Sequence, residues 1–150
     1  MLPGASLRDD TAMPDNRDPM TARTPGLIIG VVDDDPSILR SLEWLLESAD
    51  YSVRAFAAGA DLLESGCLTE IACLISDIDM AGMDGFELLR LVHDARPDLP
   101  TILVTGYPET LKRLSLQGRS VSRVFTKPFD GQELLTAVRD TLRRSDHAET

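Results

Sequence analysis

Five polar side chains of this sequence each follow a short apolar run, at the point where a strand would end. They are Asp33, Asp34, Asp77, Thr105 and Lys127. In an open parallel α/β sheet, ligand sites form at the carboxyl ends of the strands, because the loops that leave those ends line a common crevice. We therefore expect these side chains to converge on one site that contains carboxylates, one hydroxyl and one amine.

The expected cluster of carboxylates needs a counterion. Unpaired carboxylates close together repel each other, so the cluster is stable only if it holds a cation or takes up protons. Oxygen ligands suit a hard ion, and a site with few protein ligands and several remaining waters suits Mg²⁺ better than Ca²⁺. Bound Mg²⁺ would neutralise an incoming phosphoryl group and leave one carboxylate free as the nucleophile.

Short apolar runs alternate with amphipathic stretches along the chain. These runs, together with an alternating pattern at 51–56, predict strands at residues 27–32, 51–56, 71–76, 101–105 and 121–126. The amphipathic stretches predict a helix that starts at residue 36 and helices at 59–64, 86–94, 109–117 and 132–144. This alternation predicts an α/β fold with three layers and a doubly wound, five-stranded parallel sheet, because right-handed crossovers place helices on both faces.

Capping residues support the predicted helices. Asp35 stands as N-cap before Pro36, whose missing N–H costs nothing at the first helical position. Gly66 is expected to end the helix at 59–64, and Asp84 is expected to close a turn or cap the next helix. We expect His93 to face solvent on that helix.

The composition limits the class of protein. The chain has 150 residues and a formal net charge of −10, which predicts one domain and argues against nucleic-acid binding, because contacts to phosphates need clustered Lys and Arg. Its two cysteines, Cys67 and Cys73, predict reduced thiols. No apolar run approaches the roughly 18 residues of a membrane span, so we expect no membrane partner and a cytoplasmic location.

The ends of the chain differ in composition from its middle. Residues 1–25 are rich in Pro, Asp, Arg, Thr and Ala without periodicity, which predicts a disordered N-terminal leader. Residues 26–145 hold the alternating pattern, and residues 146–150 are expected to form a polar C-terminal tail.

Four motifs give the chain a family resemblance. They are VDDDP at residues 32–36, DIDMAGMDG at 77–85, VTG at 104–106 and KPF at 127–129. Each alone is weak, but together, in this order and at strand ends, they are highly specific. Over residues 26–145 the sequence resembles a response regulator receiver domain of bacterial two-component signalling. The resemblance implies the flavodoxin-like receiver fold.

The resemblance also implies how the carboxylates act. Asp77 would be the phosphoacceptor, taking a phosphoryl group from a sensor histidine kinase or a histidine phosphotransfer protein. Asp34 would hold Mg²⁺ directly and Asp33 mainly through water. Asp77 and the backbone carbonyl of Asp79 would complete the protein ligands. No enzymatic activity is implied beyond self-phosphorylation from phosphodonors and autodephosphorylation.

Lys127 and Thr105 would respond to the phosphoryl group by this resemblance. Lys127 would pair with Asp77 and then with a phosphate oxygen, while the Thr105 hydroxyl would move to bond another. The change would bias a two-state surface made by the fourth helix, fifth strand and fifth helix. We expect a stand-alone receiver whose output is contact with a downstream protein, with a homodimer as one form that phosphorylation could favour.

The sequence departs from the family pattern at several positions. Val124 stands three residues before the lysine, where the family usually has Tyr or Phe, so the resemblance does not carry an aromatic switch to this position. Ala81 replaces the usual Pro after the phosphorylation site, which should loosen that loop. Gly106 leaves more room above the phosphate. We also expect Asp79 and Tyr107 to set the lifetime of the phosphorylated state.

Two other interpretations remain open. The pair Asp77 and Asp79 resembles the strand-end Asp-x-Asp of haloacid-dehalogenase-like phosphatases, but Ala81 lacks the usual Thr or Val, and the Asp33-Asp34 pair precedes the nucleophile instead of following it. A degenerate receiver that binds proteins without phosphorylation is the other alternative. The complete polar set at the strand ends argues against it.

Overall fold

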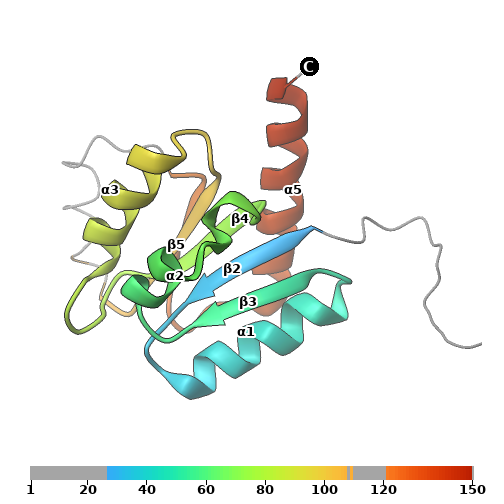
Figure 1. Ribbon diagram of the computed structural model, residues 1–150. Coiled ribbons are helices and arrows are strands. Elements are labelled where there is room, and N and C mark those ends of the chain that lie inside the picture. Colours follow the sequence, from blue (N-terminus) through green and yellow to red (C-terminus); the bar gives the residue numbers. More distant parts are fainter. Residues whose placement is uncertain (1–26, 108, 110–120, 150) are drawn as a thin grey trace, which may run out of the picture.

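A parallel β-sheet forms the centre of the molecule (Figure 1). The computed structural model of the chain describes residues 27–107, 109 and 121–149, with side chains as far as residue 144. The five strands run in the order β3-β2-β4-β5-β6, and every neighbouring pair is parallel. Their bounds are Ile28–Val32 for β2, Ser52–Phe56 for β3, Cys73–Asp77 for β4, Thr101–Thr105 for β5 and Arg123–Thr126 for β6.

Helices cover both faces of this sheet. The helices are α1 (Pro36–Ser48), α2 (Gly59–Ser65), α3 (Gly85–Ala95) and α5 (Gly131–Glu149), with a short 3₁₀ turn η1 (Cys67–Thr69) after α2. Figure 1 shows α1 and α5 on one side and α2 and α3 on the other. The predicted three-layer, doubly wound α/β fold is confirmed.

Two hydrophobic layers hold the helices to the sheet. The layer under α1 and α5 includes Ile29, Ile75, Leu46 and Val138, all buried. The layer under α2 and α3 contains other residues of the same strands, such as Leu74 of β4. Because helices cover both faces, every residue of β4 and of β5 is buried, and this explains the apolar runs CLI in β4 and ILV in β5.

The predicted elements differ from the structure mainly at their ends. Strand β4 begins at Cys73, two residues later than predicted, and Asp77 is its last residue. The last helix continues to Glu149, beyond the predicted end at Arg144 and into the segment predicted to be a polar tail. The helix predicted at 109–117 and the leader predicted at 1–25 lie outside the described residues. In the described part of the chain, no helix is long and apolar enough to cross a membrane.

The predicted caps are confirmed. The Asp35 side chain accepts from the backbone N–H of Ser37 at 2.9 Å, and the Asp84 side chain accepts from the N–H of Glu87 at 3.0 Å. Gly66 ends α2 with a φ of 80°, in the left-handed region that favours glycine. The Asp35 carboxylate therefore caps the N-terminus of α1, and the Asp84 carboxylate caps the N-terminus of α3.

The prediction for His93 was wrong. This side chain is only 8% exposed, and its Nε2 lies 3.2 Å from the hydroxyl oxygen of Thr101 at the start of β5. The last turn of α3 packs against the sheet, so a polar residue there is buried with a hydrogen-bond partner instead of facing water.

Candidate functional site

Neighbouring strands bring the predicted carboxylates to one edge of the sheet. Strands β2 and β4 pair in register up to Val32 and Ser76, so the next residues, Asp33 and Asp77, lie side by side at the edge of the sheet. The Asp33 N–H still donates to the carbonyl of Phe56 at 3.1 Å, which extends the pairing with β3 and fixes this residue at the rim. The parallel direction of the strands thus places both carboxylates in one crevice.

The three carboxylates of this edge form a compact group. Asp33, Asp34 and Asp77 each offer one oxygen, and these oxygens lie within 4.8 Å of one another. Asp33 and Asp77 are only 2% and 3% exposed, whereas Asp34 is exposed. One acidic side chain therefore meets solvent at the mouth of the crevice while the other two lie beneath it.

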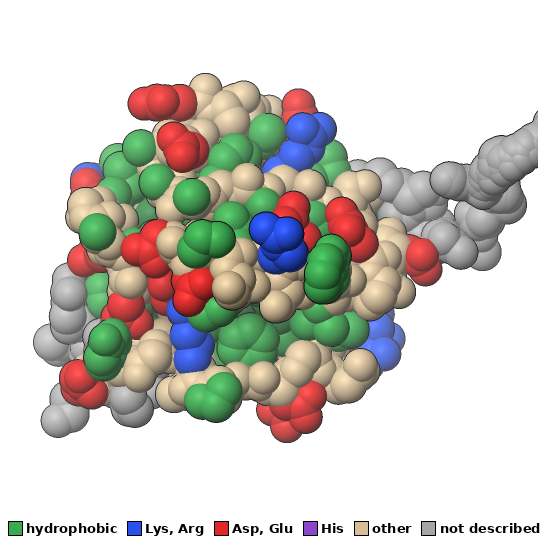
Figure 2. Space-filling model, turned by 90° about the horizontal axis from the view of Figure 1, so that it is seen from below, with side chains coloured by type: hydrophobic (Ala, Val, Ile, Leu, Met, Phe, Trp, Pro, Cys, Tyr) green, Lys and Arg blue, Asp and Glu red, His purple; other side chains and the backbone are tan. Residues whose placement is uncertain are grey.

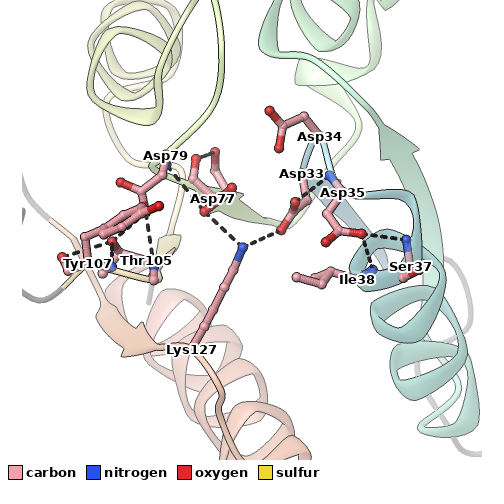
Figure 3. A network of polar contacts seen from close by, with 12 residues as sticks. Asp33, Asp34, Asp35, Ser37, Ile38, Asp77, Asp79, Thr105, Tyr107 and Lys127 are labelled. Carbon is pink, nitrogen blue, oxygen red and sulfur yellow. Dashed lines mark hydrogen bonds and ion pairs between the residues drawn. The ribbon is translucent and has the colours of Figure 1, made fainter.

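Lys127 bridges the two buried carboxylates (Figure 3). It follows β6, and its Nζ lies 3.2 Å from Asp33 Oδ2 and 3.3 Å from Asp77 Oδ1. The backbone N–H of Lys127 donates to the backbone carbonyl of Thr105 at 2.7 Å. This bond continues the pairing of β6 with β5 and directs the Lys127 side chain toward the crevice. One ammonium group thus compensates part of the negative charge of three carboxylates.

Burial and charge alter the proton affinity of these groups. Burial, together with the nearby Asp33 carboxylate, raises the pKa of Asp77 to about 6, although Lys127 opposes the change. Burial by itself would lower the pKa of Lys127, but the carboxylates of Asp33 and Asp77 outweigh it and the net change is upward. The amine therefore stays charged, and Asp77 carries an excess of unfavourable interactions when it is ionised.

A tight loop after β4 completes the floor of the site. The Gly85 N–H donates to the carbonyl of Ile78 at 2.9 Å, and a Cβ added to Gly85 would lie 2.6 Å from the carbonyl oxygen of Asp77. Gly82 adopts a φ of 75°, which favours glycine. Met80 is buried and Met83 is half-buried, and both pack against the layer under α2 and α3. The glycines of the motif thus let α3 start directly against the end of β4.

Thr105 lies at the same rim, at the end of β5, but is bonded to a different carboxylate. Its Oγ1 donates to Asp79 Oδ2 at 2.6 Å and lies 3.2 Å from the carbonyl of Tyr107. The Gly106 N–H donates to the same Asp79 oxygen at 3.1 Å. The family resemblance implies the backbone carbonyl of Asp79 as a metal ligand, and the Asp79 side chain is expected to affect the lifetime of the phosphorylated state. Neither expectation indicated that this side chain would hold Thr105.

The structure places Val124 and the next residue on opposite faces of β6. Val124 packs with Ile78 and Phe86, under α3. Phe125 packs in the layer under α1 and α5, with its ring centroid 6.2 Å from that of Phe129. Because successive side chains of a strand alternate between faces, Phe125 cannot take the place of an aromatic residue at position 124.

An apolar groove adjoins Lys127. Its volume is about 630 Å³, and its lining residues are Ile38, Ser41, Leu42, Leu45, Lys127, Pro128, Phe129 and Gly131. On the face shown in Figure 2, acidic side chains gather beside a basic one, and hydrophobic side chains line a hollow next to them. Apolar surface is therefore available to a protein that approaches the site.

The donors at this site fit a hard divalent cation. The cluster supplies three carboxylate oxygens, and the single lysine leaves it with net negative charge. Both oxygens of Asp33 are already engaged, Oδ1 by the N–H of Asp35 at 2.9 Å and Oδ2 by Lys127. Asp34 is exposed, and its Oδ2 accepts a long 3.4 Å bond from the Ala81 N–H. Few direct protein ligands with room for waters are what Mg²⁺ prefers.

Comparison with known proteins agrees with this arrangement. The family described as "Response regulator receiver domain" matches residues 29–139. The transcriptional regulatory protein FixJ of Azorhizobium caulinodans is 30% identical over 119 residues, which are 79% of this chain and 56% of FixJ. The DNA-binding transcriptional regulator NtrC of Escherichia coli K12 is 36% identical over 111 residues, which are 74% of this chain and 24% of NtrC.

A solved structure shows the same fold along nearly its whole length. The CheY-like response regulator receiver domain protein of Methanospirillum hungatei JF-1 superposes with a TM-score of 0.73 at 28% identity, covering 81% of this chain and 98% of that one. This chain spans little more than half of FixJ and about a quarter of NtrC, so it corresponds to one part of those regulators. The chain belongs to the response regulator receiver domain family, whose members act in two-component signal transduction.

Proposed function

We propose that this chain is a Mg²⁺-dependent phosphoacceptor and that Asp77 is the residue that carries the phosphoryl group. The observation that supports this most directly is the position of the Lys127 ammonium between Asp77 and Asp33, with Asp34 exposed beside them. Asp77 ends a central strand, and the groups that could balance a phosphoryl charge surround it. Both oxygens of Asp33 accept hydrogen bonds, whereas Lys127 and the Asp79 N–H both contact the same oxygen of Asp77, Oδ1, so Asp77 is the better nucleophile.

The transfer step is a displacement at phosphorus. An Oδ atom of ionised Asp77 forms the new P–O bond while the P–N bond of a phosphohistidine on the donor protein breaks. The electron pair of that bond stays on the donor nitrogen, which takes up a proton from solvent. Lys127 stabilises the negative charge on the phosphoryl oxygens, so the protein contributes mainly positioning and charge neutralisation.

Asp33, Asp34, Asp77 and the backbone carbonyl of Asp79 are the groups that would hold Mg²⁺. When bound, the ion supplies neutralisation of the phosphoryl charge. The mutual repulsion of the three carboxylates supports this assignment, because a cation removes it.

The response to phosphorylation is proposed to be a change in a protein-binding surface. The phosphoryl group adds about −1.5 to −2 charge and strong acceptor oxygens beside Thr105 and Lys127. A downstream protein is the proposed partner, and the net charge of −10 disfavours direct contact with nucleic-acid phosphates. Dimerisation on phosphorylation and a cytoplasmic location stay predictions.

Intact mass tests the proposed acceptor. The native chain, Asp77→Asn and the control Asp35→Asn are incubated with acetyl phosphate and Mg²⁺. Asparagine still caps α1 at position 35, so the control loses a nearby charge but keeps its fold. We expect one added phosphoryl group on the native chain and on the control, none on Asp77→Asn, and none on any chain in the presence of a chelator.

Other outcomes would point elsewhere. If the folded native chain gains no mass and binds neither Mg²⁺ nor beryllofluoride, the protein is a receiver-like module that binds partners without phosphorylation. Repeated hydrolysis of a small phosphomonoester, without an accumulated phosphoprotein, would support the phosphatase interpretation instead.

A further inference from the structure

The Asp79 carboxylate connects the loop after β4 to the end of β5. Its Oδ2 accepts from the Thr105 hydroxyl at 2.6 Å and from the Gly106 N–H at 3.1 Å. Thr105 and Gly106 follow Asp79 by 26 and 27 residues in the sequence, so both hydrogen bonds are tertiary contacts. Hydrogen bonds to an ionised acceptor are roughly twice as strong as neutral ones, and Thr105 is fully buried. This carboxylate is therefore a strong anchor for the end of β5.

The same residue also touches the proposed phosphoacceptor. The Asp79 N–H lies 3.4 Å from Asp77 Oδ1, while its side chain turns the other way, toward Thr105 and Tyr107 (Figure 3). A hydroxyl carries a single proton to donate. If the Thr105 hydroxyl donates its hydrogen bond to a phosphoryl oxygen on Asp77, its hydrogen bond to Asp79 Oδ2 must break.

We propose that the Asp79 side chain is a positioning group that holds Thr105 and Gly106 in the resting arrangement and competes with the phosphoryl group for the Thr105 hydroxyl. This inference rests on the proposed function of Asp77. Phosphorylation then exchanges one anionic acceptor for another at the same hydroxyl. The end of β5 moves only when the Thr105 hydroxyl bonds to the phosphoryl oxygen instead of to Asp79 Oδ2. Asp79 thereby sets how readily the phosphorylated arrangement forms.

Binding of beryllofluoride in saturating Mg²⁺ measures this competition, because the ligand imitates a phosphoryl group on a carboxylate. Asp79→Ala removes the competing acceptor and keeps the backbone carbonyl assigned to the ion. We expect its Kd to fall about tenfold, which is about 1.4 kcal/mol. Asp79→Asn retains a side-chain oxygen acceptor without the charge, so its Kd should fall by clearly less.

Two controls separate the lost hydrogen bond from the lost charge. Asp35→Asn removes a carboxylate charge near the crevice without touching Thr105, and its Kd should equal that of the native chain. In a Thr105→Val background there is no hydroxyl to compete for, so Asp79→Ala should leave the Kd nearly unchanged relative to Thr105→Val alone. Such a double-mutant cycle isolates the coupling between Asp79 and Thr105.

The resting bond has its own spectroscopic signature. In the ligand-free, ¹⁵N-labelled chain, the Gly106 amide proton bonded to a carboxylate should resonate downfield, and Asp79→Ala should move it upfield more than Asp79→Asn does. An unmoved Gly106 signal would overturn the proposal. Equal Kd values for the native chain and Asp79→Ala, or an equal gain in the Thr105→Val background, would also overturn it while leaving Asp77 as acceptor. A native chain that binds no beryllofluoride would overturn the proposed function, and the competition with it.

Discussion

The two halves of the site differ in how their charged and polar groups are balanced. On the side of β2 and β4, Lys127 contacts two of three clustered carboxylates, so negative charge remains in excess. On the side of β5, one carboxylate oxygen accepts two donors, from Thr105 and Gly106. The first half holds an excess of negative charge, whereas the second is a satisfied hydrogen-bond set.

This difference indicates which half should respond to which change. Excess charge in a buried crevice makes stability depend on pH, metal and neighbouring charges. A satisfied hydrogen-bond set depends on the identity of its partners and little on metal. Changes at the carboxylate half should therefore be larger and sensitive to conditions, and changes at the Thr105 half smaller and constant.

The largest effect is expected when Lys127, the cation that the described residues place in the carboxylate half, is removed. Lys127→Ala leaves Asp33 and Asp77 buried without their shared partner, so the free energy of unfolding should fall by about 3 kcal/mol at pH 7 in chelator. Acidification should restore part of the loss, because protonation of Asp77 removes a charge. Urea unfolding at pH 7 and pH 5 measures this. Arg143→Ala, which breaks an exposed pair with Asp140, is the control and should show no such recovery.

Mg²⁺ should stabilise the same half. A ligand that binds only the folded state at a hundred times its Kd adds about 2.7 kcal/mol. Thermal unfolding with and without Mg²⁺ should show this gain for the native chain and for Asp35→Asn, and a much smaller gain for Asp34→Ala. Equal stabilisation of Asp34→Ala would place the ion elsewhere.

Asp77→Asn should stabilise the metal-free protein at pH 7 by at most about 3 kcal/mol, since it removes a carboxylate whose pKa is raised from 3.8 to about 6 in the folded state. The native protein takes up this proton before the unfolded chain does, so it gains stability as the pH falls from about 6 toward 4. The advantage of the variant should shrink over that range. Urea unfolding across this pH range in chelator is the measurement. A gain that does not change with pH would contradict the charge argument, and Asp98→Asn in an exposed loop serves as the reference.

The smallest effect is expected in the hydrogen-bonded half. Thr105→Val keeps the shape but removes the donor to Asp79, so it should cost about 1 kcal/mol, with little dependence on Mg²⁺. Thr136→Val is the matched control, because its hydroxyl donates to the carbonyl of Gln132 on the exposed side of α5. A loss at Thr105 that Mg²⁺ reverses would show that the two halves are not independent.

Much of the fold could be predicted because its signals are local. The apolar runs of β4 and β5 follow from burial on both faces, and the N-caps Asp35 and Asp84 follow from helix-end chemistry that a few residues contain. The predicted ends of the strands and helices agree less well with the structure than the elements themselves. Strand β4 starts later than its apolar run, because Ile71 is buried in the approach to the strand.

The sequence by itself determined the alternation of elements and the polar residues at the ends of β2, β4, β5 and β6, since parallel strands must present those ends at one edge. Only the tertiary structure decided which partners those groups take. The bonds from Asp79 to Thr105 and from Lys127 to Asp33 join segments 26 and 94 residues apart. The burial of His93 against Thr101 likewise depends on how α3 packs on the sheet. The physical reason is that such contacts depend on register and packing angle, which no local pattern of residue types contains.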